Sequence, residues 1–442
     1  MSNICIIGDI LVDITLKQTN IPLKMRLGGI VHSARCLWAM GIDYDIGYFA
    51  PSYLDSHIED YLLNHMGCKR LFKLGNVENC PYTMLINEAK EVGDQGYEFI
   101  LRDDINISYN NKELEKLEAY TDIFLISGNY SFEIIRNNIA KETRVHYDIA
   151  NNVTNLSFLE GCNTLETIFI STSSTIFREF NSNDTLDINL FFNQFKNLTN
   201  RIVLKENRGG SRAYDFQEKV IINIPSQTQK ITHSVGVGDV YDLACISLYN
   251  QSYSFSDSLN YSSWIATEYA KTTFPDDFKK MTLRILKTPI DEIKSLGGCF
   301  LPWEKRKRGH IYLAAPDFDF VDTSLIDILE NSLLYHNFSP HRPIKENGQM
   351  PLKATWQEKQ DLFTKDMQLL DECNMLIAIL LYNDPGTLIE IGLAAERKIP
   401  TFVYDPFHIA SNCMLTQLPD LVSSNLDEIL SEVFLSYSKL IS

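Results

Sequence analysis

The chain has 442 residues, more than one ordinary hydrophobic core can serve, so two domains are expected. Its net charge of −17 at pH 7 argues against binding to nucleic acid or an anionic membrane, because both need clustered lysines and arginines. No apolar run reaches the roughly 18 residues of a membrane span, and the nine scattered cysteines form no CxxC pair. These features favour a reduced cytoplasmic protein with no metal site of the zinc type.

Short apolar strands alternate with helical patterns along the whole chain, which is typical of α/β folds. Residues 14–27 and 80–103 differ, because they alternate polar with apolar and aromatic side chains as a small antiparallel sheet or flap would. A helix is expected at 256–272. The strands expected before it are 4–7, 44–49, 123–127, 145–148, 167–170 and 202–204.

A domain boundary is expected where this pattern loosens. Two glycines at 297–298, Pro302 and the basic residues 305–308 interrupt it, and we interpret the basic residues as part of a solvated linker. A new α/β pattern then starts, with strands near 311–314, 375–381 and 400–404. We therefore expect a first domain at 1–297, a linker at 298–309 and a second domain at 310–442.

The most informative stretch of the second domain runs from Asp384 to Glu390. It follows a buried apolar strand, and Asp-Pro is a good helix start, with Asp384 as N-cap and Pro385 in the first turn. Glu390 then falls about two turns into an otherwise apolar helix. A carboxylate in such a place is costly to bury unless it is paired or used.

Two further side chains are expected near this helix. Tyr312 lies on the first strand of the domain, and Asp366 lies on the helix that leads into the central strand. In an open parallel sheet, ligands bind outside the carboxyl ends of the strands, where these residues could meet. Carboxylates and a phenol suit cleavage of a glycosidic bond, with one carboxylate attacking the anomeric carbon and another acid assisting the leaving group.

Each of these residues also has a simpler interpretation. Glu390 could reach solvent, Asp384 could serve only as an N-cap, and Asp366 could be a surface acid. Tyr312 could be a core aromatic residue. Gly386 and Thr387 could simply open the helix, or they could bind a substrate oxygen or phosphate at its positive end.

Residues 310–405 resemble the nucleoside 2-deoxyribosyltransferase superfamily, which also contains nucleoside-monophosphate N-glycosidases. The resemblance implies that Glu390 is the nucleophile on the sugar C1′ and that Tyr312 orients it. It implies that Asp384 contacts or protonates the base, that Asp366 holds a sugar hydroxyl or acts near the 5′ side, and that no cofactor is required. The matching pieces are Tyr312-Leu313-Ala314-Ala315-Pro316, Asp366 with residues 370–374, and Asp384-Pro385-Gly386-Thr387-Leu388-Ile389-Glu390-Ile391-Gly392.

The first domain contains several short motifs: residues 8–13, Leu27-Gly28-Gly29 with 34–41, 122–128, 147–148 and Gly236-Val237-Gly238-Asp239. Through these motifs residues 1–285 resemble the ribokinase-like (PfkB) carbohydrate kinases. The resemblance implies ATP and Mg²⁺ as cofactors, Asp239 as the base, and an anion hole for the transferring phosphoryl group at the helix start formed by Gly236, Val237 and Gly238. The sugar site would include Asp13, Gly28, Gly29 and His32.

This first domain departs from the kinase pattern. His32 stands where an Asn usually contacts the sugar, His233 where an Asp usually precedes the glycines, and Val237 where a small Ala is usual. Residues 171–174 read Ser-Thr-Ser-Ser instead of Asn-x-x-Glu, so the acid that organises Mg²⁺ is missing. The retained Asp239 favours kinase activity and the missing acid disfavours it, while Asp239, His32 and His233 could also be purely structural.

Two doubly wound α/β domains, a ribokinase-like fold with a small β lid and a flavodoxin/Rossmann-like deoxyribosyltransferase fold, are therefore expected. The leading hypothesis is an enzyme that cleaves or transfers the N-glycosidic bond of a nucleoside or nucleotide, coupled to a kinase-like domain that binds a nucleoside or sugar. One alternative is a ligand-gated effector that depletes nucleotides in stress or phage defence. Another is an ATP-dependent kinase with an accessory C-terminal domain. Both resemblances also imply a homo-oligomer.

Overall fold

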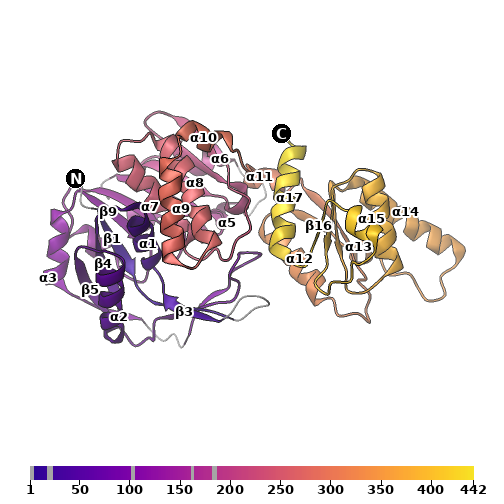
Figure 1. Cartoon of the computed structure of the whole chain (residues 1–442), viewed down its shortest axis with the longest axis horizontal. Coiled ribbons are helices and arrows are strands. Elements are labelled where there is room, and N and C mark those ends of the chain that lie inside the picture. The colour runs from indigo at the N-terminus through magenta and orange to yellow at the C-terminus, as the bar shows by residue number, and fades with distance from the viewer. Residues whose placement is uncertain (1–3, 17–22, 101–104, 161–163, 182–186) are drawn as a thin grey trace. The chain divides into compact units, whose positions relative to one another are not determined.

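The computed structural model describes residues 4–16, 23–100, 105–160, 164–181 and 187–442. The chain divides into two compact units (Figure 1). Unit 1 contains residues 1–90 and 95–300, and unit 2 contains residues 91–94 and 301–442. Both units are α/β, as the alternation of strand and helix patterns predicts.

Unit 1 is built on a ten-stranded sheet with the order β14-β13-β12-β11-β10-β9-β1-β4-β5-β8. The seven strands from β12 to β5 run parallel, and β13, β14 and β8 are antiparallel additions at the two edges. The strands are Ile4–Asp9 (β1), Tyr44–Ala50 (β4), Leu71–Glu78 (β5), Asn106–Tyr109 (β8), Asp122–Ile126 (β9), Arg144–Asp148 (β10), Leu165–Ser171 (β11), Thr199–Lys205 (β12), Ser211–Asp215 (β13) and Val220–Ile224 (β14). The strands predicted in this part of the chain are all present.

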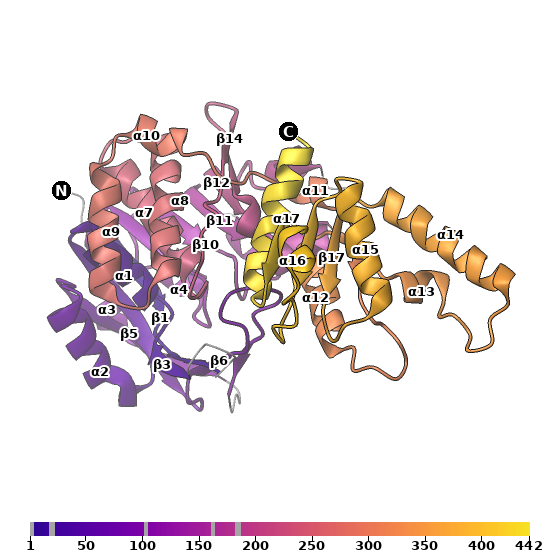
Figure 2. The ribbon, with the colours of Figure 1, turned by 45° about the vertical axis from the view of Figure 1, so that its right-hand side comes forward.

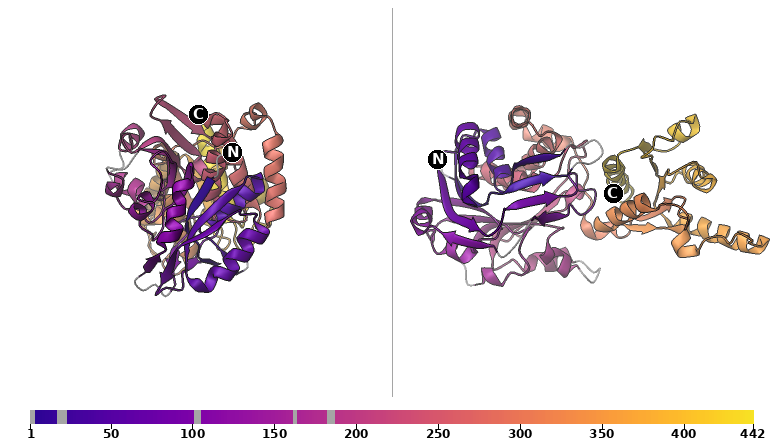
Figure 3. Two further views of the ribbon diagram at one scale, coloured as in Figure 1. Left: turned by 90° about the vertical axis from the view of Figure 1, so that its left-hand side faces the viewer. Right: turned by 90° about the horizontal axis from the view of Figure 1, so that it is seen from below.

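The central strands of unit 1 are buried on both faces, which explains their unbroken apolar sequences. On one face Ile4, Ile6 and Phe124 pack in the core against a layer of helices. These helices lie side by side in Figure 1 and are seen from other directions in Figure 3. They are α1 (Val31–Met40), α7 (Val237–Asn250), α8 (Phe255–Lys271) and α9 (Pro275–Lys287), of which α8 matches the predicted helix.

A second, four-stranded sheet in unit 1 forms the predicted β lid, with the order β3-β2-β6-β7. Its strands are Val12–Thr15 (β2), Lys24–Leu27 (β3), Thr83–Ile86 (β6) and Tyr97–Phe99 (β7). The prediction of an antiparallel sheet is wrong for one pair. Two antiparallel hairpins, β2–β3 and β6–β7, are joined through β2 and β6, and these two strands run parallel. Residues 17–22 and 101–103 of the predicted flap lie outside the described residues.

Unit 2 is a five-stranded, fully parallel sheet with the order β16-β15-β17-β18-β19. Helices cover both faces, as Figures 1 and 2 show, so this unit is doubly wound. Tyr312, Leu376 and Ala378 share one core cluster with residues of α14 and α15. The elements are His310–Ala314 (β15), Ser324–Tyr335 (α12), Ser339–His341 (β16), Pro343–Asn347 (α13), Trp356–Glu372 (α14), Met375–Ile379 (β17), Pro385–Glu396 (α15), Thr401–Tyr404 (β18), Cys413–Gln417 (α16), Leu421–Ser423 (β19) and Leu426–Leu440 (α17).

The segment 298–309 is not a solvated connector throughout. Cys299 pairs with Ser226 of unit 1, and Trp303 and Arg306 are buried. The Arg306 guanidinium lies over the rings of Trp303 and Phe434 at 5.2 and 4.9 Å. The expectation of a solvated position is therefore wrong for Arg306, because planar guanidinium groups stack on aromatic faces and can be buried there.

Among the described residues, no helix is both long enough and apolar enough to cross a lipid bilayer.

Candidate active site

The start of α15 has the predicted geometry. Asp384 is the N-cap, and its Oδ2 accepts hydrogen bonds from the backbone N–H of Thr387 at 2.8 Å and from the Thr387 hydroxyl at 3.0 Å. Pro385 lies in the first turn, where its missing N–H costs nothing. The hydroxyl proton of Thr387 is committed to Asp384, so Thr387 organises this carboxylate, and a direct contact of Thr387 with substrate stays a prediction.

Glu390 and Tyr312 are brought together by α15 and β15. The Tyr312 hydroxyl, at the end of a buried side chain, donates to Glu390 Oε1 at 2.7 Å. Burial raises the pKa of Glu390 to about 7, the Tyr312 hydrogen bond opposes the rise, and the negative charges of Asp366 and Asp384 add to it. Burial and Glu390 likewise raise the pKa of Tyr312, so the phenol stays protonated and donates. Tyr312 is therefore both a core aromatic residue and a hydrogen-bond partner of Glu390.

Asp366 lies on α14, as predicted, and is half-buried. Its Oδ1 accepts a hydrogen bond from Asn347 Nδ2 at 2.9 Å. Burial raises the pKa of Asp366 above its ordinary value, and the Asn347 hydrogen bond partly offsets that rise. Two further carboxylates thus repel Glu390, and each of the three acids accepts from a neutral donor: a phenol on Glu390, a hydroxyl and a backbone N–H on Asp384, and an amide on Asp366.

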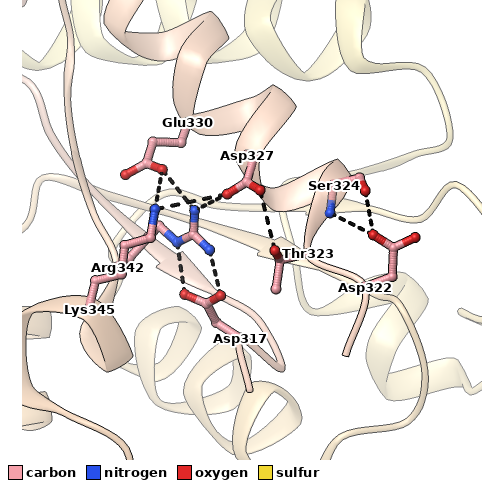
Figure 4. A network of polar contacts seen from close by, with 8 residues as sticks. All are labelled: Asp317, Asp322, Thr323, Ser324, Asp327, Glu330, Arg342 and Lys345. Carbon is pink, nitrogen blue, oxygen red and sulfur yellow. Dashed lines mark hydrogen bonds and ion pairs between the residues drawn. The ribbon is translucent and has the colours of Figure 1, made fainter. Parts of the chain in front are cut away.

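Arg342 is buried and follows β16, the strand that pairs with β15, and Figure 4 shows its contacts. Arg342 Nε donates to Asp317 Oδ2 at 2.8 Å and its NH2 reaches the other oxygen, while NH1 contacts Asp327 and, at 2.8 Å, Glu330. Lys345 also donates to Glu330, at 2.9 Å. Asp317 lies on the loop that follows β15, so Arg342 fixes the chain just beyond the strand that carries Tyr312.

The predicted sugar site of unit 1 is a chain of buried polar contacts. His32 Nε2 lies 3.1 Å from Asp13 Oδ2, and His32 Nδ1 lies 2.6 Å from the Tyr269 hydroxyl. Burial lowers the pKa of His32 to about 4, so this ring is neutral at pH 7. The glycines are required here: a Cβ on Gly28 would lie 2.1 Å from the Asp13 carboxylate, and one on Gly236 would lie 2.2 Å from the His32 ring. His32 therefore occupies one oxygen of the expected sugar-binding aspartate.

At the start of α7, the predicted base Asp239 follows Gly236, Val237 and Gly238. Burial, followed by repulsion from Asp148, raises the pKa of Asp239 to about 7. The Lys205 ammonium faces the start of α7 and lies 3.2 Å from the position that a Cβ on Gly238 would take. The same ammonium pairs with Asp148 at 3.0 Å and with Asp242 at 2.6 Å.

The segment that lacks the expected acid forms a local turn. Ser174 caps α5 (Thr175–Phe180) by accepting from the Phe177 N–H, and the hydroxyls of Ser171 and Ser173 bond to each other. A hollow of about 630 Å³ lies elsewhere in unit 1, lined by residues such as Phe132, Tyr147 and Phe158, and contains none of the predicted site residues. No cluster of metal-ligating side chains is found within the described part of the chain.

Three residues that hold the two sites in place are not predicted from the sequence. Lys205 lies at the end of a strand, where a single lysine gives no signal, and Asn347 lies on a five-residue helix too short for a periodic pattern. Arg342 stands between His341 and Pro343 in a segment that looks unlike a substrate loop. The acidic surroundings in which Arg342 is buried come from distant parts of the chain.

Comparison with known proteins agrees with the resemblance of the second domain. Residues 311–416 match the family model described as nucleoside 2-deoxyribosyltransferase. No curated protein matches. Residues 311–416 are therefore similar to nucleoside 2-deoxyribosyltransferases.

Several solved kinase structures resemble 65% of this chain. Ribokinase of Arabidopsis thaliana, complexed with ribose and ATP, is 14% identical over 99% of its own length, with a TM-score of 0.48. Phosphofructokinase-2 of Escherichia coli, in complex with fructose-6-phosphate, is 15% identical over 100% of its length, with a TM-score of 0.48. The nucleoside kinase of Methanocaldococcus jannaschii is 14% identical over 99% of its length, with a TM-score of 0.45.

The raised pKa of Glu390 predicts a pH-dependent stability difference for Glu390→Gln. The folded pKa of about 7 exceeds the ordinary value of 4.5, so the stability that protonated Glu390 contributes is complete below about pH 4.5 and is lost as the pH rises through 7. Glutamine cannot ionise, so at pH 8 the variant should be more stable than the wild type by up to about 3 kcal/mol. Urea unfolding of unit 2 at pH 5 and pH 8 measures this difference.

The control for this measurement is Glu396→Gln, which changes an exposed residue of the same helix. It should show no pH-dependent difference from the wild type. The stability of Glu390→Gln relative to the wild type could instead be the same at both pH values. That result would contradict the conclusion that Glu390 is a buried carboxylate whose charge is disfavoured.

Gly236→Ala should destabilise unit 1 more than Gly41→Ala. Both glycines have left-handed backbones, with φ of 76° and 73°, so each alanine carries a similar backbone cost of roughly 1–2 kcal/mol. Only Gly236 adds a clash with the His32 ring, because nothing lies within 4 Å of a Cβ on Gly41. Urea unfolding of both variants gives the comparison, and equal losses would show that His32 does not press on the start of α7.

Proposed function

We propose that unit 2 cleaves the N-glycosidic bond of a nucleoside through a covalent glycosyl-enzyme on Glu390. The observation that carries this proposal is the 2.7 Å hydrogen bond from a buried tyrosine to one oxygen of a partly buried glutamate, next to two further carboxylates. The match of residues 311–416 to the nucleoside 2-deoxyribosyltransferase model supports the same chemistry.

In this proposal each oxygen of Glu390 has its own role. Tyr312 holds Glu390 Oε1, which leaves Oε2 to attack C1′ of the sugar. The C1′–N bond breaks as the C1′–O bond forms, and the base leaves with a proton supplied by an acid such as Asp384 or by solvent. Water or a second base then attacks C1′ and frees Glu390, which gives hydrolysis or transfer respectively.

The charges favour a neutral nucleoside over a nucleoside 5′-phosphate. Asp366 and Asp384 both raise the pKa of Glu390, so the site already disfavours negative charge. The cations on the neighbouring segment, Arg342 and Lys345, are occupied by Asp317, Asp327 and Glu330. A phosphate dianion would therefore enter a negative field in which both of these cations are already paired.

Glu390→Ala should abolish release of free base. We would incubate the protein with nucleosides, deoxynucleosides, their 5′-monophosphates and NAD, and separate the bases by liquid chromatography. The wild type should release base from a nucleoside faster than from its monophosphate, and the loss in Glu390→Ala should be at least about 1,000-fold, because it removes the nucleophile. Adding a second base distinguishes transfer from hydrolysis.

Glu396→Ala, on the exposed side of the same helix, serves as the control and should keep full activity. Base release that persists in Glu390→Ala would remove Glu390 as the nucleophile. Release from monophosphates alone would refute the charge argument.

A second proposal concerns unit 1, which we infer to be a ligand-binding module that does not transfer phosphate. Phosphoryl transfer needs positive charge and Mg²⁺ organised around the phosphates at a helix start. Here the Lys205 ammonium stands against Gly238 and is neutralised by Asp148 and Asp242, while residues 171–174 supply no acid. These residues do not fit MgATP, whereas Asp13 retains an oxygen that could accept a ligand hydroxyl. This favours a sensor that controls unit 2.

The wild type should form no ADP above background from ATP and Mg²⁺ with any sugar or nucleoside of the same panel. A coupled ADP assay tests this, with Asp239→Asn as the comparison. A sugar or nucleoside should nevertheless raise the unfolding temperature of the wild type and not that of Asp13→Asn. ADP formation that disappears in Asp239→Asn would restore the kinase interpretation.

A further inference from the structure

The segment 341–347 comprises the end of β16 and helix α13. Four of its side chains contact other parts of unit 2. His341 Nε2 lies 2.8 Å from His310 Nδ1, and Arg342 and Lys345 bind the carboxylates of Figure 4. Asn347, at the last position of α13, donates to Asp366. The segment thus links β15, the strand that carries Tyr312, to Asp366, one of the carboxylates of the site.

Helix α13 cannot hold this position by itself. It has five residues, none of them buried, and an isolated helix of that length is unstable in water. Arg342 immediately precedes it, with a side chain only 3% exposed and hydrogen bonds to three carboxylates. Such a buried, fully paired guanidinium is costly to displace, so Arg342 fixes the start of α13 and thereby the place of Asn347.

The contact with Asp366 has a consequence for the site. An amide N–H that donates to Oδ1 favours the ionised form of Asp366 and holds the carboxylate at that oxygen. The charge of Lys365 also favours the ionised form, and burial outweighs both effects, so the pKa of Asp366 stays above its ordinary value. Asn347 adds no charge of its own, so it holds Asp366 without neutralising the site.

We propose that Asn347, anchored by Arg342, is a positioning residue that sets the orientation and ionisation of Asp366. This inference rests on the proposed glycosidase function of unit 2 and adds a residue that acts through another. It predicts that the contribution of Asn347 to activity disappears when Asp366 can no longer ionise.

The test is a double-mutant cycle of Asn347→Leu and Asp366→Asn, with base release from the best nucleoside as the readout. Asn347→Leu keeps the size of the side chain and removes its donor. It should lower kcat about 10- to 100-fold with little change in unfolding temperature, as expected for lost positioning. In the Asp366→Asn background the same substitution should change kcat less than about two-fold, and Asn347→Gln, which keeps a donor, should restore part of the loss.

The matched control is Gln357→Leu. Gln357 also donates an amide hydrogen bond to an aspartate of α14, at 2.8 Å to Asp361, but both residues are exposed. Its kcat should equal that of the wild type. Additive losses in the cycle, or an Asn347→Leu protein with wild-type kcat, would overturn the proposal.

A second measurement separates this inference from the proposed function. Carboxyl-detected NMR of protein labelled with ¹³C at the aspartate side chains follows the titration of Asp366, identified by the signal missing in Asp366→Asn. The pKa of Asp366 should move upward in Asn347→Leu and stay in place in Gln357→Leu. An unmoved pKa overturns the role of Asn347 even if no base release is found, whereas a wild type without base release and with a moved pKa contradicts only the glycosidase.

Discussion

The candidate site of unit 2 depends on how one carboxylate, that of Glu390, is held on an apolar helix. Glu390 lies on α15 between residues that pack in the core, and burial alone would neutralise it. Tyr312 offsets part of that cost with one hydrogen bond from the opposite element, and it can do so because β15 is the strand that faces α15. The arrangement keeps the pKa of Glu390 near 7, so a substantial fraction is ionised at neutral pH and is weakly solvated, as suits a nucleophile.

Asp384 is both an N-cap and a member of the carboxylate group, and the two roles support each other. The cap fixes where α15 begins, and the beginning of the helix fixes where Glu390 lies two turns later. In our proposal Asn347, anchored by Arg342, holds Asp366 from a different segment. Three separate parts of the chain therefore supply the donors to these acids: β15 to Glu390, the first turn of α15 to Asp384, and α13 to Asp366.

The sequence predicts the features that are local. The strands are recognisable from apolar runs, the start of α15 from Asp-Pro, and the start of α7 from Gly-Val-Gly-Asp, because each follows from neighbouring residues. The contacts that decide chemistry come from distant residues: Lys205 with Asp148 and Asp242, His32 with Tyr269, and Arg342 with Asp317. No periodicity marks such pairs. The parallel β2–β6 pair and the burial of Arg306 were missed for the same reason.

The two units treat buried acids in opposite ways, and this difference bears on their chemistry. In unit 1 a cation, Lys205, is placed among Asp148 and Asp242, so that the start of α7 faces charge that is already compensated. In unit 2 the donors to Glu390, Asp384 and Asp366 are a phenol, a hydroxyl with a backbone N–H, and an amide, all of them neutral. Neutral donors orient carboxylates and leave their negative charge in place. Cleavage of a glycosidic bond develops positive charge on the sugar ring, and an uncompensated negative site stabilises that charge more in the transition state than in the neutral substrate.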